Sequence, residues 1–227
     1  MKTVGVIGGL GPETTAEFYL ELIFGAYEKN KLERPNIIIW NVPIKYKFEE
    51  DLLKKSSGEE RYIPFLVDAA KNLESAGADF LVMPCNSLHI FIDQIRAAVN
   101  IPVLSIVEET ASFLHYKKIR SVGILATSTS LKKKLYEKSL RAAKITQVVP
   151  DGFNQAKIGK MISNIVINRH DNKDRQDLLK IIDDFKKVDA VILACTDLQL
   201  LIPANSRFVI YDTMKIFAEA TVSRLLE

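Results

Sequence analysis

The sequence predicts an α/β fold, namely two similar three-layer α/β/α halves with mostly parallel sheets related by pseudo-twofold symmetry. Short continuous apolar runs alternate with segments of helical periodicity, which is typical of parallel strands covered on both faces. Two sequence patterns also occur twice, since residues 4–9 are similar to residues 122–127, and residues 80–87 are similar to residues 190–197. The chain is therefore expected to contain an internal repeat.

The individual elements follow from apolar runs and from apolar residues that recur every three to four positions. Strands are predicted at residues 3–7, 36–41, 80–83, 103–105, 121–126, 190–194 and 208–211. Helices are predicted at residues 16–29, 62–76, 87–99, 107–116, 129–143, 155–168, 175–187 and 213–226. Gly77, Pro102 and Pro203 are expected to end their segments. The lysine- and glutamate-rich residues 45–61 are interpreted as a long mobile loop that covers a ligand.

The repeat divides the chain into two α/β halves. The first spans residues 1–104 and carries Cys85, and the second spans residues 105–211 and carries Cys195. The C-terminal helix, at residues 212–227, is expected to pack back on the first half. Because ligands of open α/β sheets bind beyond the carboxyl ends of the strands, the active site is expected in the cleft between the halves.

Composition limits the classes of function. The 31 basic and 28 acidic residues are interspersed and leave a net charge of +3, which favours neither a nucleic-acid groove nor a membrane-binding face. No apolar run approaches the ~20 residues of a membrane-spanning helix, and no signal peptide is recognised. We therefore expect a cytoplasmic protein with a small-molecule ligand. In that reducing compartment a structural disulfide is disfavoured, so the two cysteines invite a redox, metal or catalytic explanation.

Cys85 and Cys195 are the only cysteines, and each lies where a predicted strand gives way to a helix. A thiol at a helix N-terminus has a lowered pKa, because the thiolate meets the positive end of the helix dipole. Residues suited to capping a helix follow each cysteine: Asn86 and Ser87 in the first half, Thr196 and Asp197 in the second. Two thiols at equivalent positions can present acid/base groups to opposite sides of one ligand.

Other uses of the cysteines are less favoured. A zinc site usually needs four clustered ligands, and Cys85, His89 and Cys195 lack Cys-x-x-Cys spacing, so we expect no metal. A Cys85–His89 nucleophile is conceivable but leaves Cys195 without a role. A redox dithiol requires the Cβ atoms to come within roughly 3.8 Å of each other. His115 and His170, in polar surroundings, are expected to be solvated.

The glycine-rich turn after the first strand, Gly8-Gly9-Leu10-Gly11-Pro12, matches neither nucleotide-binding fingerprint. Thr14 stands where a dinucleotide-binding turn has its third glycine, and the Gly-Lys-Ser/Thr of a P-loop is missing. Two interpretations remain open. Gly9 and Gly11 let the backbone approach a carboxylate at a helix N-terminus, or they form only a tight turn.

Three motifs together resemble the signatures of the aspartate/glutamate racemase family, and aspartate racemase most closely. They are Gly8-Gly9-Leu10-Gly11-Pro12-Glu13-Thr14-Thr15, Met83-Pro84-Cys85-Asn86-Ser87-Leu88-His89 and Ala194-Cys195-Thr196-Asp197. The resemblance covers nearly the whole chain. It implies two facing α/β domains with one catalytic cysteine each, Cys85 and Cys195, no pyridoxal phosphate or other cofactor, and usually a homodimer.

The resemblance also suggests how the substrate is held. Candidate substrate-binding residues are Gly9, Gly11, Asn86, Ser87, Thr127, Thr129 and Thr196, with Asp197 and His89 supporting the site. Departures from the family pattern are Ser87 for Thr, Ala194 for Gly and Asp197 for Glu. Aspartate-specific relatives often carry an arginine near residues 41–47, and this chain offers only Lys45 or Lys47 there, with Arg169 as a weaker candidate.

The predicted function is racemisation of aspartate, with glutamate next. One cysteine as thiolate removes the α-proton, and the other as thiol delivers a proton to the opposite face. One alternative is a racemase, isomerase or decarboxylase of another small carboxylate or a hydantoin. Another is a non-catalytic, two-lobed sensor that binds an anion.

Overall fold

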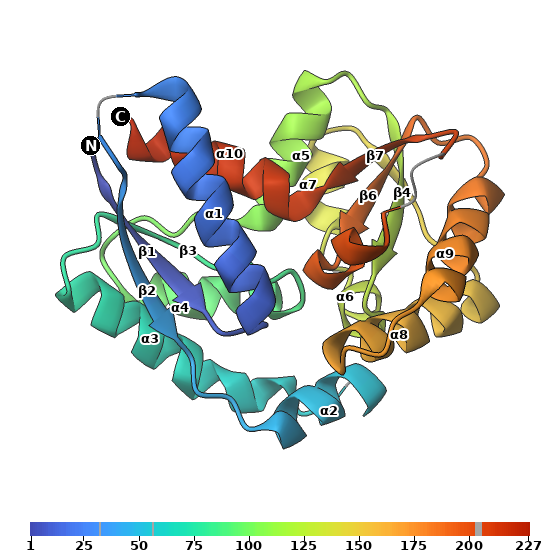
Figure 1. Cartoon of the computed structure of the whole chain (residues 1–227), viewed down its shortest axis with the longest axis horizontal. Coiled ribbons are helices and arrows are strands. Elements are labelled where there is room, and N and C mark those ends of the chain that lie inside the picture. The colour runs from blue at the N-terminus through green and yellow to red at the C-terminus, as the bar shows by residue number, and fades with distance from the viewer. Residues whose placement is uncertain (32, 56, 203–205) are drawn as a thin grey trace.

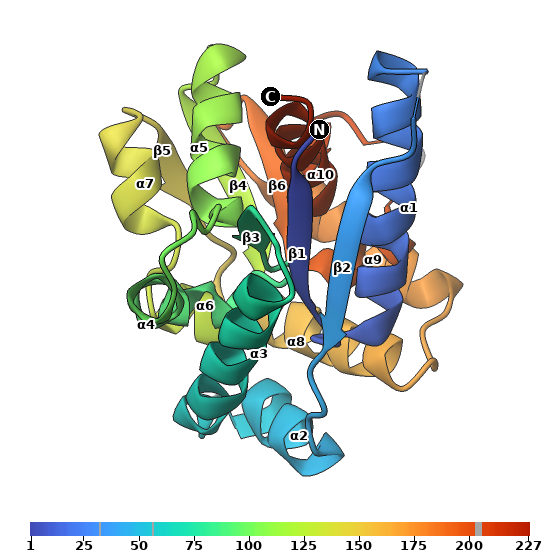
Figure 2. The ribbon, with the colours of Figure 1, turned by 90° about the vertical axis from the view of Figure 1, so that its left-hand side faces the viewer.

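The computed structural model describes residues 1–31, 33–55, 57–202 and 206–227. It contains two parallel sheets beside each other (Figure 1). The first has the order β2-β1-β3 (Figure 2) and the second the order β5-β4-β6-β7. The strands are β1 (Thr3–Gly8), β2 (Asn36–Asn41), β3 (Phe80–Val82), β4 (Ser121–Ala126), β5 (Thr146–Val148), β6 (Ala190–Ala194) and β7 (Val209–Asp212). Every strand pair is parallel, which confirms the predicted fold class.

The helices connect and cover these strands. The α-helices are α1 (Pro12–Lys29), α2 (Tyr46–Lys55), α3 (Ile63–Ser75), α4 (Ile92–Ala98), α5 (Ile106–Tyr116), α6 (Ser128–Lys132), α7 (Glu137–Ala142), α8 (Gly152–Val166), α9 (Asn172–Asp184) and α10 (Thr213–Leu225). Short 3₁₀ helices are η1 (Glu59–Tyr62), η2 (Ser87–Phe91) and η3 (Thr196–Leu201). None of the described helices combines the length and the apolar character that crossing a membrane requires.

The two repeated patterns form the same pair of neighbouring strands in each sheet. Gly5 of β1 pairs with Leu81 of β3, and Gly123 of β4 pairs with Val191 of β6. Each glycine leaves room for a packed side chain: a Cβ on Gly5 would lie 2.6 Å from Leu81 Cδ2, and one on Gly123 would lie 3.0 Å from the Phe185 ring. Each cysteine then follows four residues after the strand residue paired with the glycine, so the repeat delivers both thiols from equivalent places.

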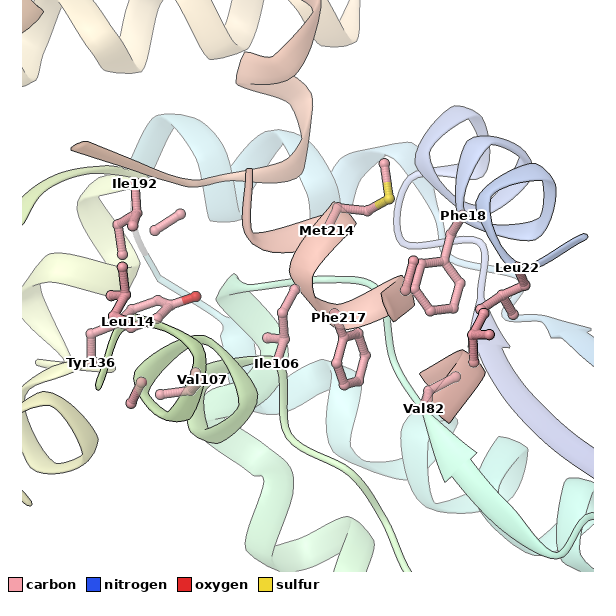
Figure 3. Close-up of a cluster of buried hydrophobic side chains, with 14 of the residues drawn as sticks. Phe18, Leu22, Val82, Ile106, Val107, Leu114, Tyr136, Ile192, Met214 and Phe217 are labelled. Carbon is pink, nitrogen blue, oxygen red and sulfur yellow. The ribbon is translucent and has the colours of Figure 1, made fainter. Parts of the chain in front are cut away.

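A single hydrophobic cluster lies between the two sheets (Figure 3). Met214 and Phe217 of α10 lie between Phe18 of α1 and Ile106 of α5, and the Phe18 and Phe217 rings stack with centroids 5.7 Å apart. The cluster also takes in Val6 of the first sheet and buried residues of the second. The C-terminal helix thus contacts both halves, and close packing holds their cysteine-bearing loops in a fixed relation.

The outer faces of the sheets have separate cores. Strand residues alternate between the two sides: Val4 and Val6 point into the shared cluster, whereas Ile7 points to α3 with Leu81 and Met83. In the second sheet the outer layer is α8 and α9, which pack on Val191 and Leu193. Helices therefore cover both faces of each sheet, as the continuous apolar strands predicted.

The prediction that residues 45–61 form a long loop was wrong. This segment forms α2 and η1. Phe48 and Leu52, four residues apart, pack against the outer core of the first half, and Arg61 Nη2 pairs with Asp51 Oδ2 at 3.0 Å. The many charged residues led to the prediction of a loop, but the segment contains an amphipathic helix, and Asp51 of that helix forms the ion pair with Arg61.

Smaller differences concern short elements. The strand predicted at residues 103–105 is a single bridge between Val103 and Leu81, and the three-residue edge strand β5 was missed. The predicted helix at residues 129–143 is split into α6 and α7, with Lys134 between them at a φ of 55°. The predicted helix at residues 87–99 begins as η2. Pro203 lies outside the described residues.

Candidate active site

A cavity of about 600 Å³ opens between the two halves, at the carboxyl ends of the central strands. The first half contributes the turn after β1, the start of α1 and the residues after β2 and β3. The second half contributes the residue after β4, the end of α8 and the residues after β6. Both Cys85 and Cys195 line it, and neither is in a disulfide. The fold therefore brings the two repeated cysteine motifs to one site.

The two thiols differ in environment. Cys85 is half-buried, whereas Cys195 is only 5% exposed and its Sγ lies 3.4 Å from Asp197 Oδ2, to which it donates a hydrogen bond. Burial raises the pKa of Cys195 well above its usual value, and the negative charge of Asp197 raises it further. A charge on Cys85 also raises the pKa of Cys195, as expected for two thiols that line one cavity.

The expectation that a helix dipole lowers the thiol pKa was wrong for Cys195. The residue is the N-cap of η3, a short 3₁₀ helix, and no side-chain cap bond is formed there. Asn86, the N-cap of η2, likewise makes no side-chain cap bond. A single short turn offers little dipole to a thiolate, and burial beside a carboxylate outweighs it.

Asn86 lines the cavity, but its side chain is engaged with the second half. Its Nδ2 donates to Thr213 Oγ1 at 3.0 Å, and its Oδ1 accepts a hydrogen bond from the Tyr136 hydroxyl. Thr213 Oγ1 in turn donates to the carbonyl oxygen of Leu193 on β6. Burial raises the pKa of Tyr136, which keeps its hydroxyl protonated as a donor. Through Thr213, Asn86 thus ties the Cys85 loop to β6, the strand that Cys195 follows.

Ser87 and Thr127 form a second link between the halves. Ser87 Oγ lies 2.9 Å from Thr127 Oγ1 and 3.3 Å from Ser130 Oγ, and Thr127 caps α6 by accepting from the Ser130 amide. Ser87 and Thr127 line the cavity. Thr129 does not, because its hydroxyl is directed to the carbonyl oxygen of Leu52, 3.4 Å away.

The remaining predicted contacts lie around the start of α1. Thr196 lines the cavity, and its Oγ1 accepts from Thr14 Oγ1 at 3.5 Å. Gly9 has a φ of +82°, and a Cβ there would lie 2.7 Å from Asn41 Oδ1, so glycine is required. The Gly9 amide donates to Thr15 Oγ1 within the turn. Gly9 and Gly11 therefore form cavity wall, and the amide of Gly9 is not free for a ligand.

His89 supports the Cys85 loop from behind. Its Nε2 accepts from the Ile106 amide at 3.1 Å, so Nδ1 carries the proton and donates to the Cys85 carbonyl oxygen at 2.7 Å. Burial lowers the pKa of His89 to about 4, and the ring is neutral at pH 7. Both ring nitrogens are occupied by backbone groups, so the geometry does not support a Cys85–His89 nucleophile.

The basic residues proposed for a side-chain carboxylate are not part of the described cavity wall. Lys47 Nζ pairs with Glu50 Oε2 at 3.1 Å and Asp51 Oδ1 at 3.5 Å, and Lys45 is exposed. Arg169 is exposed and also lies outside the lining residues. Asp197, which was expected to support the site, lines the cavity beside Cys195.

Sequence reasoning missed several polar residues of the cavity wall, among them Glu13, Glu17, His170 and Gln199. His170 was expected to be solvated, yet it is partly buried there, and its Nδ1 is buried. Two signals could have found the others. Glu13 and Glu17 are four residues apart on the helix that starts at the site, and Gln199 is the counterpart of His89 in the repeat. Within the described part of the chain, no group of three or more metal-ligating side chains was found.

Comparison with known proteins adds independent information. The model of a family described as Asp/Glu/Hydantoin racemase matches residues 7–221. The broad specificity amino-acid racemase RacX of Bacillus subtilis is 27% identical over 235 residues, covering 98% of each chain. Among solved structures, an aspartate racemase homologue from Pyrococcus horikoshii superposes with a TM-score of 0.81 and is 26% identical, covering all of both chains. A protein from Yersinia pestis assigned as an Asp/Glu racemase gives a TM-score of 0.88 at 25% identity, again over all of both chains.

Proposed function

The chain belongs to the Asp/Glu/hydantoin racemase family and is an amino-acid racemase of the kind that works without pyridoxal phosphate, and we propose that Cys85 and Cys195 are its two acid/base groups. The observation that carries this proposal is the pair of cysteine thiols at equivalent positions of the repeat, on the wall of one cavity. Inverting a carbon centre requires proton removal from one face and delivery to the other, and one group in each half meets that need.

In the proposed reaction, the Cys85 thiolate takes the α-proton, and the electron pair of the broken C–H bond passes into the α-carboxylate as it gains enolate character. Cys195 then delivers its S–H proton to the opposite face. The cycle ends with Cys85 as thiol and Cys195 as thiolate, which is the state that turns over the other enantiomer. In the free enzyme the high pKa of Cys195 favours its thiol form and thus its role as the acid.

Hydrogen-bond donors must stabilise the developing negative charge on the α-carboxylate. The hydroxyls of Thr14, Ser87, Thr127 and Thr196 line the cavity and come from both halves, which supports this role. Asn86 is assigned instead to positioning, because Tyr136 and Thr213 occupy its side chain. The resemblance names aspartate as the first substrate to assay and glutamate as the second, and the α-carbon chemistry is common to other amino acids.

Deuterium incorporation tests the two-base mechanism directly. In heavy water, wild-type protein supplied with an L-amino acid that it accepts should form D product that already carries deuterium at Cα, measured by chiral chromatography with mass spectrometry. Cys85→Ala and Cys195→Ala should each lose interconversion, by at least about a thousandfold. Ser139→Ala, a change outside the cavity wall, is the control. Either cysteine variant racemising at the wild-type rate would sink the proposal.

The alternatives predict other outcomes in the same assays. A hydantoin or other small-carboxylate isomerase would exchange that compound and leave amino acids untouched. An anion sensor would gain thermal stability from the ligand without any exchange, even when both cysteines are replaced by serine.

We also propose a cytoplasmic homodimer. The outer face of α1 exposes Leu20, Phe24 and Tyr27, and the neighbouring edge strand β2 exposes Ile39 and Trp40. An apolar face of this kind is typical of a protein interface. Sedimentation should give a dimer that Phe24→Glu dissociates and Phe153→Glu, on α8, does not. A wild-type monomer would contradict the dimer, and cell fractionation checks the compartment.

A further inference from the structure

We propose that the racemase site accepts an amino acid with a cationic side chain, which Glu13, Glu17 and Gln199 bind. This inference rests on the proposed function, because it names the substrate class of the same cavity. It departs from the acidic side chain that the sequence favoured.

The charges of the cavity wall point to this class. Three carboxyl groups line the cavity, those of Glu13, Glu17 and Asp197, while none of the lysines and arginines among the described side chains does so. An aspartate substrate would bring two carboxylates and one ammonium group to this wall, whereas a lysine-like substrate brings one carboxylate and two ammonium groups. Coulomb interactions in a partly desolvated cleft therefore disfavour the acidic substrate and favour the basic one.

Hydrogen-bond capacity gives a second, independent indication. Gln199 Nε2 donates to Glu17 Oε2 at 2.5 Å, so α1 of the first half and η3 of the second meet at this point of the wall. The other end of the amide, Gln199 Oε1, is buried and has no hydrogen-bond partner among the described residues. A buried acceptor without a donor is unfavourable, and an ammonium or guanidinium group carries N–H donors and no acceptor.

The raised pKa of the Glu17 carboxyl group also agrees with a cationic side chain at this place. Burial raises the pKa of its carboxyl group, an effect that nearby Lys215 opposes and Glu21 reinforces. A bound cation would restore the full negative charge of Glu17 and gain a charge-assisted hydrogen bond. A neutral side chain could offer donors to Gln199 but could not supply this charge.

The α-ammonium group of any amino acid also needs an anionic or polar partner, and it cannot account for all three acids. Asp197 lies next to Cys195, where the α-carbon must sit for proton transfer, and is the natural partner of the α-ammonium group. Glu13 and Glu17 belong to α1, and a cavity of about 600 Å³ has ample volume for a long side chain. In this arrangement Asp197 binds the α-ammonium group, and Glu13 and Glu17 are left to bind the side-chain cation.

Matched substrate pairs test the inference. L-Arginine and L-citrulline have nearly the same shape and differ in charge, and L-norleucine is L-lysine without its side-chain ammonium group. The α-proton exchange rate in heavy water, followed by NMR, gives kcat/KM for each, with L-aspartate and L-glutamate alongside. We expect arginine to exceed citrulline by about tenfold or more, lysine to exceed norleucine similarly, and both acidic amino acids to be poorer than either cation.

Single substitutions then show whether Glu17 causes the preference for a cationic side chain. Glu17→Gln should bring the arginine-to-citrulline ratio down towards one, whereas Glu28→Gln, an exposed change at the far end of α1, should leave it unchanged. Equal kcat/KM for arginine and citrulline, a preference for aspartate or glutamate, or an unaltered ratio in Glu17→Gln would overturn the inference while leaving the two-thiol proposal intact. Absence of exchange with every amino acid would instead reject the proposed function, and the substrate class with it.

Discussion

The residues after β3 and after β6 occupy equivalent places in the two halves, yet their side chains do different things. One turn beyond Cys85, His89 is buried and ties the Cys85 carbonyl oxygen to α5. One turn beyond Cys195, Gln199 lines the cavity and reaches Glu17 of the other half. The backbone repeat thus supplies two thiols, and divergence at the following positions makes one loop a buried support and the other a part of the cavity wall.

The same divergence sets the chemistry of the thiols. Two residues after Cys85 stands Ser87, in a cluster of hydroxyl groups, whereas two residues after Cys195 stands Asp197, a carboxylate beside the sulfur. The lower exposure of Cys195 and this negative charge hold it as a thiol. A near-symmetric scaffold therefore places the two thiols in unequal environments, and the proposed mechanism uses this difference to set which thiol starts as the acid.

The largest expected effect concerns His89, which has no titrating counterpart in the second half. Its folded-state pKa of about 4 lies below the usual 6.5, so the unfolded chain binds a proton that the folded chain resists. The resulting stability is present above pH 6.5 and is lost as the pH falls to about 4, by roughly 3 kcal/mol. Urea unfolding at several pH values should show this loss, and His89→Gln, which inserts the residue of the second half, should flatten it. An unchanged pH dependence in that variant would rule out His89 as its source.

The next effect concerns the hydrogen bonds by which the second half holds the Cys85 loop. Tyr136→Phe leaves Asn86 Oδ1 buried without its donor and should lower the free energy of unfolding by about 1–3 kcal/mol. The exposed Tyr116→Phe is the control and should change it by less than about 0.5 kcal/mol. If both variants unfold at the same urea concentration, the Asn86–Tyr136 bond contributes nothing to holding the halves together.

Alkylation compares the two thiols themselves. Iodoacetamide at neutral pH should modify Cys85 faster than Cys195, by at least about tenfold, because a buried thiol of raised pKa presents little thiolate. Peptide mass spectrometry of the native protein gives both rates, and the unfolded protein, where the rates should converge, is the control. Faster modification of Cys195 would reverse the assignment of acid and base.

The smallest effect isolates the contribution of Asp197 to that difference. Asp197→Asn removes the charge that raises the pKa of Cys195 but leaves the burial, so the alkylation rate of Cys195 should rise by several-fold only. Asp93→Asn, on α4 and outside the cavity wall, should leave the rate unaltered. If Asp197→Asn does not change the alkylation rate of Cys195, burial alone accounts for the raised pKa of this thiol.

Much of the fold could be predicted from the sequence because the local sequence patterns agree with the tertiary structure. Paired glycines and apolar runs predicted β1, β4 and β6, and the two cysteine motifs placed both thiols on one cavity. The helix α2 was missed because its charges form ion pairs that only the structure reveals. The commitment of Asn86 to Tyr136 and the meeting of Gln199 with Glu17 depend on residues distant in sequence, and no local pattern encodes them.

Enantiomer-specific exchange in the single-cysteine variants tests the central claim most directly. Each purified enantiomer of an accepted amino acid is incubated in heavy water with Cys85→Ala or Cys195→Ala, and loss of the α-proton is followed by NMR. We predict that each variant exchanges only one enantiomer, that the two variants choose opposite enantiomers, and that Cys85→Ala is the slower because Cys195 is held as a thiol. Exchange of the same enantiomer by both variants, or of both enantiomers by either one, would contradict two thiols acting from opposite faces.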